Sequence, residues 1–280
     1  YNSIIYEKCI PNKIISTSNS NDIDNNNNND PRSWGIKYEP VTLMIYEYIF
    51  KTRVKSDYGC IPHINDTIQV GASPDAINID KNNTKKYGTM VEVKNIVNRD
   101  ITGIPSEEYW IQMQTQMEVC NLDKCDFVET RFKEYTCKSE IETDTNERHI
   151  YKGVILLYLP LEKNYENILQ YSPIQYTNIT DIDNWIIGNS TSIEKTHVLY
   201  NTTYWYLDEL SCTLVERNSY WFHNVIPIIR SSWKVVVDER QNGYEHRAPK
   251  SRKNTVLIEE VVNKNNYVCI MKLDEIGDII

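Results

Sequence analysis

Glu92 and Lys94 are the residues whose types and spacing first indicate chemistry. They lie in the segment TMVEVKNIV, whose strict alternation of apolar and polar residues predicts a β-strand. Residues i and i+2 of a strand project from the same face, about 6–7 Å apart along the chain. A carboxylate and an ammonium are therefore expected side by side. On their own, they also fit an ordinary charged pair on a half-exposed strand.

Asp75 is a second candidate, because the sequence can bring it close to Glu92. It follows the residues GASP, in which Gly71 and Pro74 interrupt a regular strand and predict a bend. The turn-forming segment 80–88 can pair the strand that carries Asp75 with the strand that carries Glu92. Two carboxylates would then converge beside Lys94. Two oxygen ligands with room for water form an arrangement that Mg²⁺ prefers.

Glu39 is a third carboxylate, on a helix predicted from Trp34 to Phe50 with Pro40 in its first turns. On a helical wheel it lies within the apolar stripe. A carboxylate on a buried helix face costs free energy unless it is paired or bound to a metal. The alternative is a glutamate near the helix start, where the helix dipole favours a negative charge.

A second helix is predicted from 106 to 120, with Ser106 as its N-cap. Gln114 and Gln116 flank its apolar stripe, and Gln112 lies farther round the helix. Glutamines that border a core face can reach into a site and hold a carboxylate or a water. Solvated glutamines are the ordinary alternative.

The order of these elements predicts an α/β fold with a central mixed β-sheet flanked by helices. Strands are also predicted at 125–135 and 151–160. We interpret residues 1–33 as an N-terminal tail whose Asn-rich tract, 16–30, is expected to be disordered. Residues 34–160 form the core. Residues 161–280 are predicted to be a mostly helical extension of the same domain, which could form the wall of a channel.

The composition excludes several classes of protein. The 280 residues carry a net charge of −9, which argues against a protein that coats nucleic acid but not against a metal-dependent enzyme. No run of 18 apolar residues occurs, so no transmembrane helix is predicted. The seven cysteines are an odd number with irregular spacing, typical of reduced thiols in a reducing compartment. No phosphate-binding loop of an ATP-driven motor is present.

In order and spacing, these motifs resemble those of the PD-(D/E)XK nuclease superfamily. Within it they are similar to the YqaJ-like viral recombinases, the group that includes lambda exonuclease. The resemblance covers residues 34–160, and the chain's Asn-rich style is similar to that of giant DNA virus proteins. The matching residues are Trp34-Gly35-x-x-x-Glu39-Pro40, Gly71-Ala72-Ser73-Pro74-Asp75, Val91-Glu92-Val93-Lys94 and Tyr109-x-x-Gln112-x-Gln114.

The resemblance implies a restriction-endonuclease-like fold and a site for Mg²⁺, with two ions expected and Mn²⁺ as a substitute. Asp75, Glu92 and the backbone carbonyl of Val93 are expected to hold one ion. Glu39 is expected to hold a second ion or its water. Paired divalent ions would generate the nucleophile and stabilise both oxygens of the in-line displacement at phosphorus.

The resemblance also gives roles to the neighbouring side chains. Lys94 is expected to position or activate the attacking water and to stabilise charge at the phosphate. Gln112 and Gln114 are expected to orient the active-site groups or the scissile strand. Similar exonucleases bind a 5′ phosphate through residues N-terminal to the first glutamate, and residues 1–33 show no counterpart.

Nucleic acid is expected to contact a locally basic stretch, 230–253, in which aromatic residues are interleaved. The alternative is a solvated loop between helices. The predicted nucleic-acid-binding residues are Ser73, Arg240, Arg247, Lys250, Arg252 and Lys253.

The sequence therefore predicts a Mg²⁺-dependent exonuclease that resects linear duplex DNA ends in viral recombination, repair or replication. A single-strand annealing protein, a homo-oligomer and a location in the host cytoplasm or viral factory, without secretion or membrane contact, are further expectations. A structure-specific endonuclease or an RNA-cleaving nuclease with the same site is the first alternative. The second is a non-catalytic nucleic-acid-binding scaffold, in which Asp75, Glu92 or Lys94 would be expected to be lost.

Overall fold

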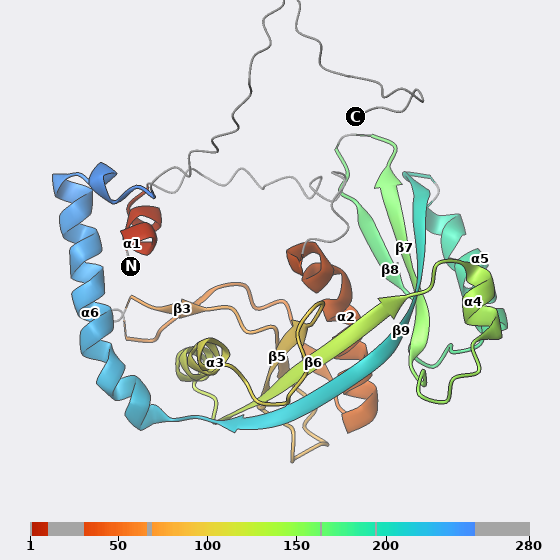
Figure 1. Cartoon of the computed structure of the whole chain (residues 1–280), viewed down its shortest axis with the longest axis horizontal. Coiled ribbons are helices and arrows are strands. Elements are labelled where there is room, and N and C mark those ends of the chain that lie inside the picture. The colour runs from red at the N-terminus through yellow and green to blue at the C-terminus, as the bar shows by residue number, and fades with distance from the viewer. Residues whose placement is uncertain (1, 11–30, 66–68, 163, 194, 250–280) are drawn as a thin grey trace, which may run out of the picture.

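The computed structural model describes residues 2–10, 31–65, 69–162, 164–193 and 195–249. Figure 1 shows a curved mixed sheet with helices on both faces. The main sheet has seven strands in the order β1-β4-β5-β6-β9-β7-β8, and a small second sheet pairs β2 with β3. The strands are β1 Val54–Lys55, β2 Ile61–Pro62, β3 Gly71–Ala72, β4 Ala76–Asn78, β5 Met90–Asn95, β6 Lys124–Glu134, β7 Lys152–Pro160, β8 Ile168–Tyr171 and β9 His197–Glu216. The helices are α1 Asn2–Cys9, α2 Pro31–Phe50, α3 Glu107–Cys120, α4 Lys138–Thr143, α5 Ile179–Ile193 and α6 Ser219–Asn242, followed by the short 3₁₀ helix η2 Glu245–Arg247. The prediction of a central mixed sheet flanked by helices is confirmed.

Strands β5 and β6 are parallel, and α3 is the crossover between them. The predicted N-cap of α3 is confirmed, because Ser106 Oγ accepts a hydrogen bond from Tyr109 N at 3.4 Å. At the other end, Asn121 adopts the left-handed conformation that commonly terminates a helix. These two signals fix where α3 starts and stops above the sheet.

Two helices cover opposite faces of β5. Alternate residues of a strand point to opposite sides, so Val91 and Val93 contact the α2 side while Met90 packs with Met113 and Met117 of α3. Glu92 and Lys94 have the parity of Met90. The strand therefore directs both candidate residues toward α3.

Helix α2 starts three residues before the predicted start. Pro31 occupies the first helical position, where its missing N–H costs nothing. Pro40 consequently lies in the helix interior and not in the first turns as predicted. There a proline removes one backbone hydrogen bond, yet the buried face of Tyr38, Val41 and Ile45 holds the helix on the sheet.

The prediction for residues 161–280 needs correction. Helices α5 and α6 lie in this part, but so do β8 and the 20-residue strand β9. Strand β9 is antiparallel to both β6 and β7, so it joins the two halves of the main sheet. Residues 250–280 lie outside the described residues. The C-terminal half therefore completes the sheet as well as adding helices.

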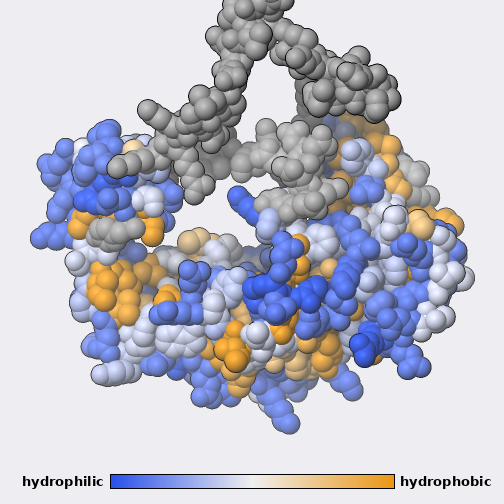
Figure 2. Space-filling view, viewed as in Figure 1, coloured by the Kyte–Doolittle hydropathy of each residue, from blue (hydrophilic) through white to orange (hydrophobic). Residues whose placement is uncertain are grey.

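Residues 1–33 were predicted to be a tail, but the described part of this range contains α1 and the start of α2. Helix α1 packs on the end of α6 through Ile5, Cys9 and Val236. The predicted disordered tract, 16–30, lies outside the described residues. Figure 2 shows the surface hollowed between the α1–α6 unit and the rest of the molecule. Helix α6 thus carries the N-terminal helix away from the sheet (Figure 1).

Trp205 of β9 lies at the centre of the core and is 1% exposed. Its ring meets Phe132 edge-on at a centroid distance of 5.5 Å. Gly153 of β7 makes room for it, since a Cβ there would lie 3.0 Å from Trp205 Cζ2. This close approach explains why β7 carries a glycine at that position.

We expect Trp205→Ala to lower the free energy of unfolding by about 3–5 kcal/mol, because the ring leaves a cavity that its neighbours cannot fill. Tyr220→Ala is the control, since that ring is 79% exposed, and its effect should stay within about 0.5 kcal/mol. Urea unfolding followed by tryptophan fluorescence and circular dichroism measures both. Equal effects of the two substitutions would contradict the assignment of this core.

Candidate active site

The Glu92 carboxylate is the centre of the site, and it is completely buried. Oxygen Oε1 accepts a hydrogen bond from Lys94 Nζ at 2.5 Å and from Gln112 Nε2 at 2.7 Å. Oxygen Oε2 accepts from Gln116 Nε2 at 2.9 Å. A buried charge is tolerated only when it is paired and hydrogen-bonded, and both conditions are met here.

The local structure explains why these groups meet. Lys94 follows Glu92 by two residues on β5, so both lie on one face of the strand. Gln112 and Gln116 are four residues apart on α3, which places them one turn apart on one face of the helix. Gln116 Nε2 also donates to the backbone oxygen of Ser73 at 3.2 Å. One amide therefore connects β5, α3 and the bend before Asp75.

Asp75 lies beside the part of β5 that has no paired strand along one edge. Strand β4 pairs with β5 only at Met90 and Val91, so the N–H of Val93 has no ladder partner there. Asp75 Oδ2 accepts that N–H at 2.7 Å. The bend predicted from Gly71 and Pro74 thus turns a carboxylate back onto the open edge of the strand.

The carboxylates of the site influence one another. Burial and the charge of Glu92 raise the pKa of Asp75 to about 7, while the Val93 N–H opposes the shift. Burial and then Glu92 also raise the pKa of Glu39, and Lys94 lowers it. Glu39 comes from α2, on the opposite face of the sheet. The open edge of β5 therefore brings together charges from both faces.

Lys94 is the cation closest to these carboxylates. Burial lowers its pKa, but Glu92 outweighs that effect and the net shift is upward. Its ammonium lies 4.9 Å from the centre of the Tyr109 ring. The side chain is thus held between a carboxylate and an aromatic face.

The residues present fit a hard divalent cation. All the candidate ligands are oxygens, and a bound cation would offset both the burial and the repulsion by Glu92 that raise the pKa of Asp75. Within the described residues, no group of three or more His, Cys, Asp or Glu is assembled closely enough to hold a metal. Asp75, Glu92 and the carbonyl of Val93, with water, would be the ligands.

A comparison with protein families found a match in the first part of the chain. Residues 3–123 match the family described as the YqaJ-like viral recombinase domain. Over these residues, which make up less than half of the chain, the chain is similar to the YqaJ-like viral recombinase family. The matched residues include α1, which precedes the expected start at 34, and they end before β6.

Similar proteins were found among known sequences and among solved structures. The chain is 26% identical over 243 residues to an uncharacterized protein of Acanthamoeba polyphaga mimivirus, with 74% of this chain covered. The chain spans 44% of the length of that relative. LHK-Exo in complex with dAMP has a TM-score of 0.40 and 17% identity, covering 74% of this chain and 68% of that one. A second structure, of the alkaline exonuclease LHK-Exo from Laribacter hongkongensis, has a TM-score of 0.39 and 17% identity, covering 86% and 87%.

Gln112 and Gln114, the two glutamines predicted for the site, contact different parts of the structure. Gln112 contacts Glu92, but Gln114 Nε2 donates to the backbone oxygen of Glu216 at 2.9 Å, and its Oε1 accepts from Asn218 N at 2.6 Å. Gln114 thus joins α3 to the segment between β9 and α6. Gln116 occupies the place expected for Gln114. The i, i+4 spacing of Gln112 and Gln116 was the signal in the sequence that could have identified it.

The predicted nucleic-acid-binding arginines make contacts within the α1–α6 unit. Arg240 donates to the backbone oxygen of Lys8, at 2.5 Å from Nη2, and lies over the Trp233 ring. Arg247 donates to Asn2 and to Glu239, at 2.8 and 2.6 Å. Lys250, Arg252 and Lys253 lie outside the described residues. In the structure, the two arginines connect α6 and η2 to α1.

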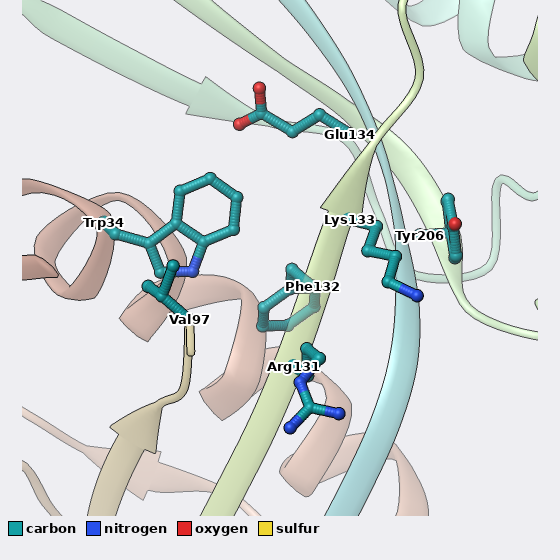
Figure 3. A pocket seen from close by; sticks show the side chains of 7 residues that line it. All are labelled: Trp34, Val97, Arg131, Phe132, Lys133, Glu134 and Tyr206. Carbon is teal, nitrogen blue, oxygen red and sulfur yellow. The ribbon is translucent and has the colours of Figure 1, made fainter. Parts of the chain in front are cut away.

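A pocket of about 340 Å³ lies beside the start of α2, at the carboxyl end of β6. Figure 3 shows that it is lined from α2, the loop after β5, β6 and β9, with Lys133 directed toward Tyr206 and Glu134 toward the other side. A second pocket, of about 480 Å³, lies between α2 and the end of β8. Neither is lined by Asp75, Glu92 or Lys94. The described helices include none long and apolar enough to cross a membrane.

Asp75→Asn tests the electrostatic crowding of the site. The folded-state pKa of about 7 exceeds the ordinary value of 3.8, so between these values the folded protein holds a proton that the unfolded chain has lost. The free energy of unfolding therefore falls as pH rises from about 4 to about 7. In EDTA at pH 8, Asp75→Asn should raise it by on the order of 1–3 kcal/mol.

The difference between Asp75→Asn and wild type should shrink at pH 5, where the folded-state carboxyl is already protonated. Urea unfolding at both pH values provides the measurement. A variant no more stable than wild type at pH 8 would show that the carboxylate is not destabilised in the fold.

Proposed function

We propose that the chain is a divalent-metal-dependent nuclease that hydrolyses DNA phosphodiester bonds as an exonuclease at duplex ends. One observation carries this proposal: the buried Glu92 carboxylate is held by Lys94, Gln112 and Gln116 beside Asp75. Hydrolysis of a phosphodiester needs an oriented water and stabilisation of negative charge at phosphorus. This cluster supplies oxygen ligands and an ammonium donor for those two needs.

Each side chain has its own part in the proposed reaction. When bound, a divalent ion such as Mg²⁺, for which Mn²⁺ could substitute, lowers the pKa of its water and neutralises phosphate charge. Asp75 and Glu92 would bind and orient that ion. Lys94, with its ammonium on the Glu92 carboxylate, donates to the water or to a phosphate oxygen. Gln112 and Gln116 fix the Glu92 carboxylate, so that its orientation does not depend on Lys94 alone.

The similarity of residues 3–123 to a viral recombinase domain supports DNA as the substrate and recombination, repair or replication as the process. The linear duplex end, a single-strand annealing partner and a homo-oligomer belong to the same proposal. The presence of Asp75, Glu92 and Lys94 in one cluster favours catalysis over a non-catalytic scaffold, since a scaffold has no need to bury them together.

Mg²⁺-dependent digestion of end-labelled linear duplex DNA, beside a closed circle of the same sequence and an RNA of equal length, tests the proposal. We expect loss of the linear duplex alone.

The results with the three substrates distinguish the alternative functions. Cutting of the circle would replace the exonuclease with an endonuclease, and cutting of RNA alone would change the substrate. If none of the three substrates is cut with either Mg²⁺ or Mn²⁺, the proposed nuclease activity is refuted.

Lys94→Gln should reduce turnover by about 10²–10⁴-fold while leaving the affinity for Mg²⁺ largely unchanged, because the amide still donates to Glu92 but carries no charge. Asp75→Ala should lose both turnover and the metal-induced rise in Tm. End-point digestion and thermal unfolding with and without Mg²⁺ measure the two properties separately. Full activity of Asp75→Ala would refute the assigned site.

Gln116→Ala should lower kcat by about tenfold, because one oxygen of a buried carboxylate loses its donor and the carboxylate turns away from its productive orientation. Gln241→Ala, an exposed position near the end of α6, is the matched control and should leave kcat unchanged. Initial rates on linear duplex DNA with saturating Mg²⁺ give the comparison. Equal rates for the two variants would remove Gln116 from the proposed site.

A further inference from the structure

Arg99 and Glu129 form an ion pair next to the proposed site. Lys94 and Glu129 are partners in the parallel register of β5 and β6, so their side chains project from the same face of the sheet. The Glu129 side chain is 0% exposed, and its Oε1 lies 2.5 Å from Arg99 Nη2. Its other oxygen, Oε2, is buried with no hydrogen-bond partner among the described residues. Among the described residues, the buried Glu129 carboxylate is thus paired with the Arg99 guanidinium alone.

Three contacts fix the position of Arg99. Its guanidinium carbon lies 5.6 Å from the centre of the Tyr109 ring, the ring that also lies under Lys94. Arg131 Nη2 donates to the backbone oxygen of Arg99 at 2.5 Å. The Glu129 carboxylate supplies the third contact. The loop after β5 therefore presents this guanidinium in one orientation.

Stability alone does not account for the pair. A buried ion pair contributes little net stability, because desolvation of the charges offsets their attraction. The Arg99 side chain is nevertheless 43% exposed, and its two side-chain hydrogen bonds, to Glu129 and to the oxygen of Asp100, engage two of its five N–H groups. An oriented, partly exposed guanidinium has the planar donor geometry that matches a phosphate.

We propose that Arg99 binds a backbone phosphate of the strand that is cut, on the side of the scissile bond next to Lys94. This inference rests on the proposed nuclease function and assigns a phosphate contact to a residue outside the carboxylate cluster. Since Lys94 and Arg99 lie over one ring, their charges are close enough to contact neighbouring phosphates of one strand. Glu129 is the positioning residue that holds the guanidinium in place.

The test uses the full chain and a fluorescent linear DNA duplex in EDTA, where no cleavage occurs. Arg99→Ala removes the phosphate contact but leaves the Glu129 charge buried and unpaired, so this variant can be unstable. The double variant Arg99→Gln with Glu129→Gln removes both charges and keeps a hydrogen-bonded pair. Arg99→Lys retains the charge without the planar fork. Arg148→Ala, an exposed arginine in the loop after α4, is the matched control for loss of one positive charge.

We expect the double variant to bind DNA roughly tenfold more weakly than wild type at low salt. The slope of log affinity against log salt between 50 and 200 mM should fall by about 1, as expected for one lost phosphate contact. Arg99→Lys should keep the slope and lose part of the affinity. Arg148→Ala should match wild type. With Mg²⁺, the double variant should show a raised KM with a smaller change in kcat.

An unchanged affinity and salt slope in a double variant whose Tm equals that of wild type would overturn the inference, and Arg99 would then be a purely structural partner of Glu129. This result is distinct from failure of the proposed function. If wild type cleaves DNA and only the Arg99 effect is missing, the phosphate contact alone is refuted. If wild type cleaves neither DNA nor RNA with any divalent ion, the nuclease itself is refuted.

Discussion

The structure of the site depends on the complete burial of one carboxylate. Glu92 lies on a central strand with no access to water, so each of its oxygens must find donors within the protein. Lys94 supplies one from the same strand, and Gln112 and Gln116 supply the others from α3. These contacts require α3 to have one position along the sheet and one rotation about its own axis. The N-cap at Ser106 and the left-handed residue at Asn121 fix where the helix begins and ends.

The short pairing of β4 with β5 is the second constraint. Because the ladder stops at Val91, the N–H of Val93 is left for a side chain, and Asp75 accepts it. The same opening lets Glu39 of α2 interact with charges on the α3 face. A regular ladder at this place would have satisfied the backbone and kept the carboxylates apart. The resulting repulsion between carboxylates lowers the stability of the fold at neutral pH, a cost that active sites commonly carry.

Several basic residues among those described connect parts of the fold. Arg240 and Arg247 connect α6 and η2 to α1, and Lys86 pairs with the buried Asp126. The locally basic composition of 230–253 therefore does not by itself mark a nucleic-acid surface. Arg99 also pairs with a buried carboxylate, but its side chain is 43% exposed and lies over the same ring as Lys94. Its orientation comes from Glu129, a residue 30 positions away.

The sequence by itself determined the elements and their chemistry: the strand that carries Glu92 and Lys94, the bend before Asp75, and the capped helix with its glutamines. These follow from local rules of periodicity, capping and turn formation, which act over a few residues. Tertiary structure decided what depends on contacts between distant segments. It selected Gln116 over Gln114 at Glu92, because helix rotation is set by packing on Met90 and Phe127. It also placed β9 inside the sheet and turned two predicted DNA-binding arginines toward α1, since strand order and ion pairing depend on which segments meet in space.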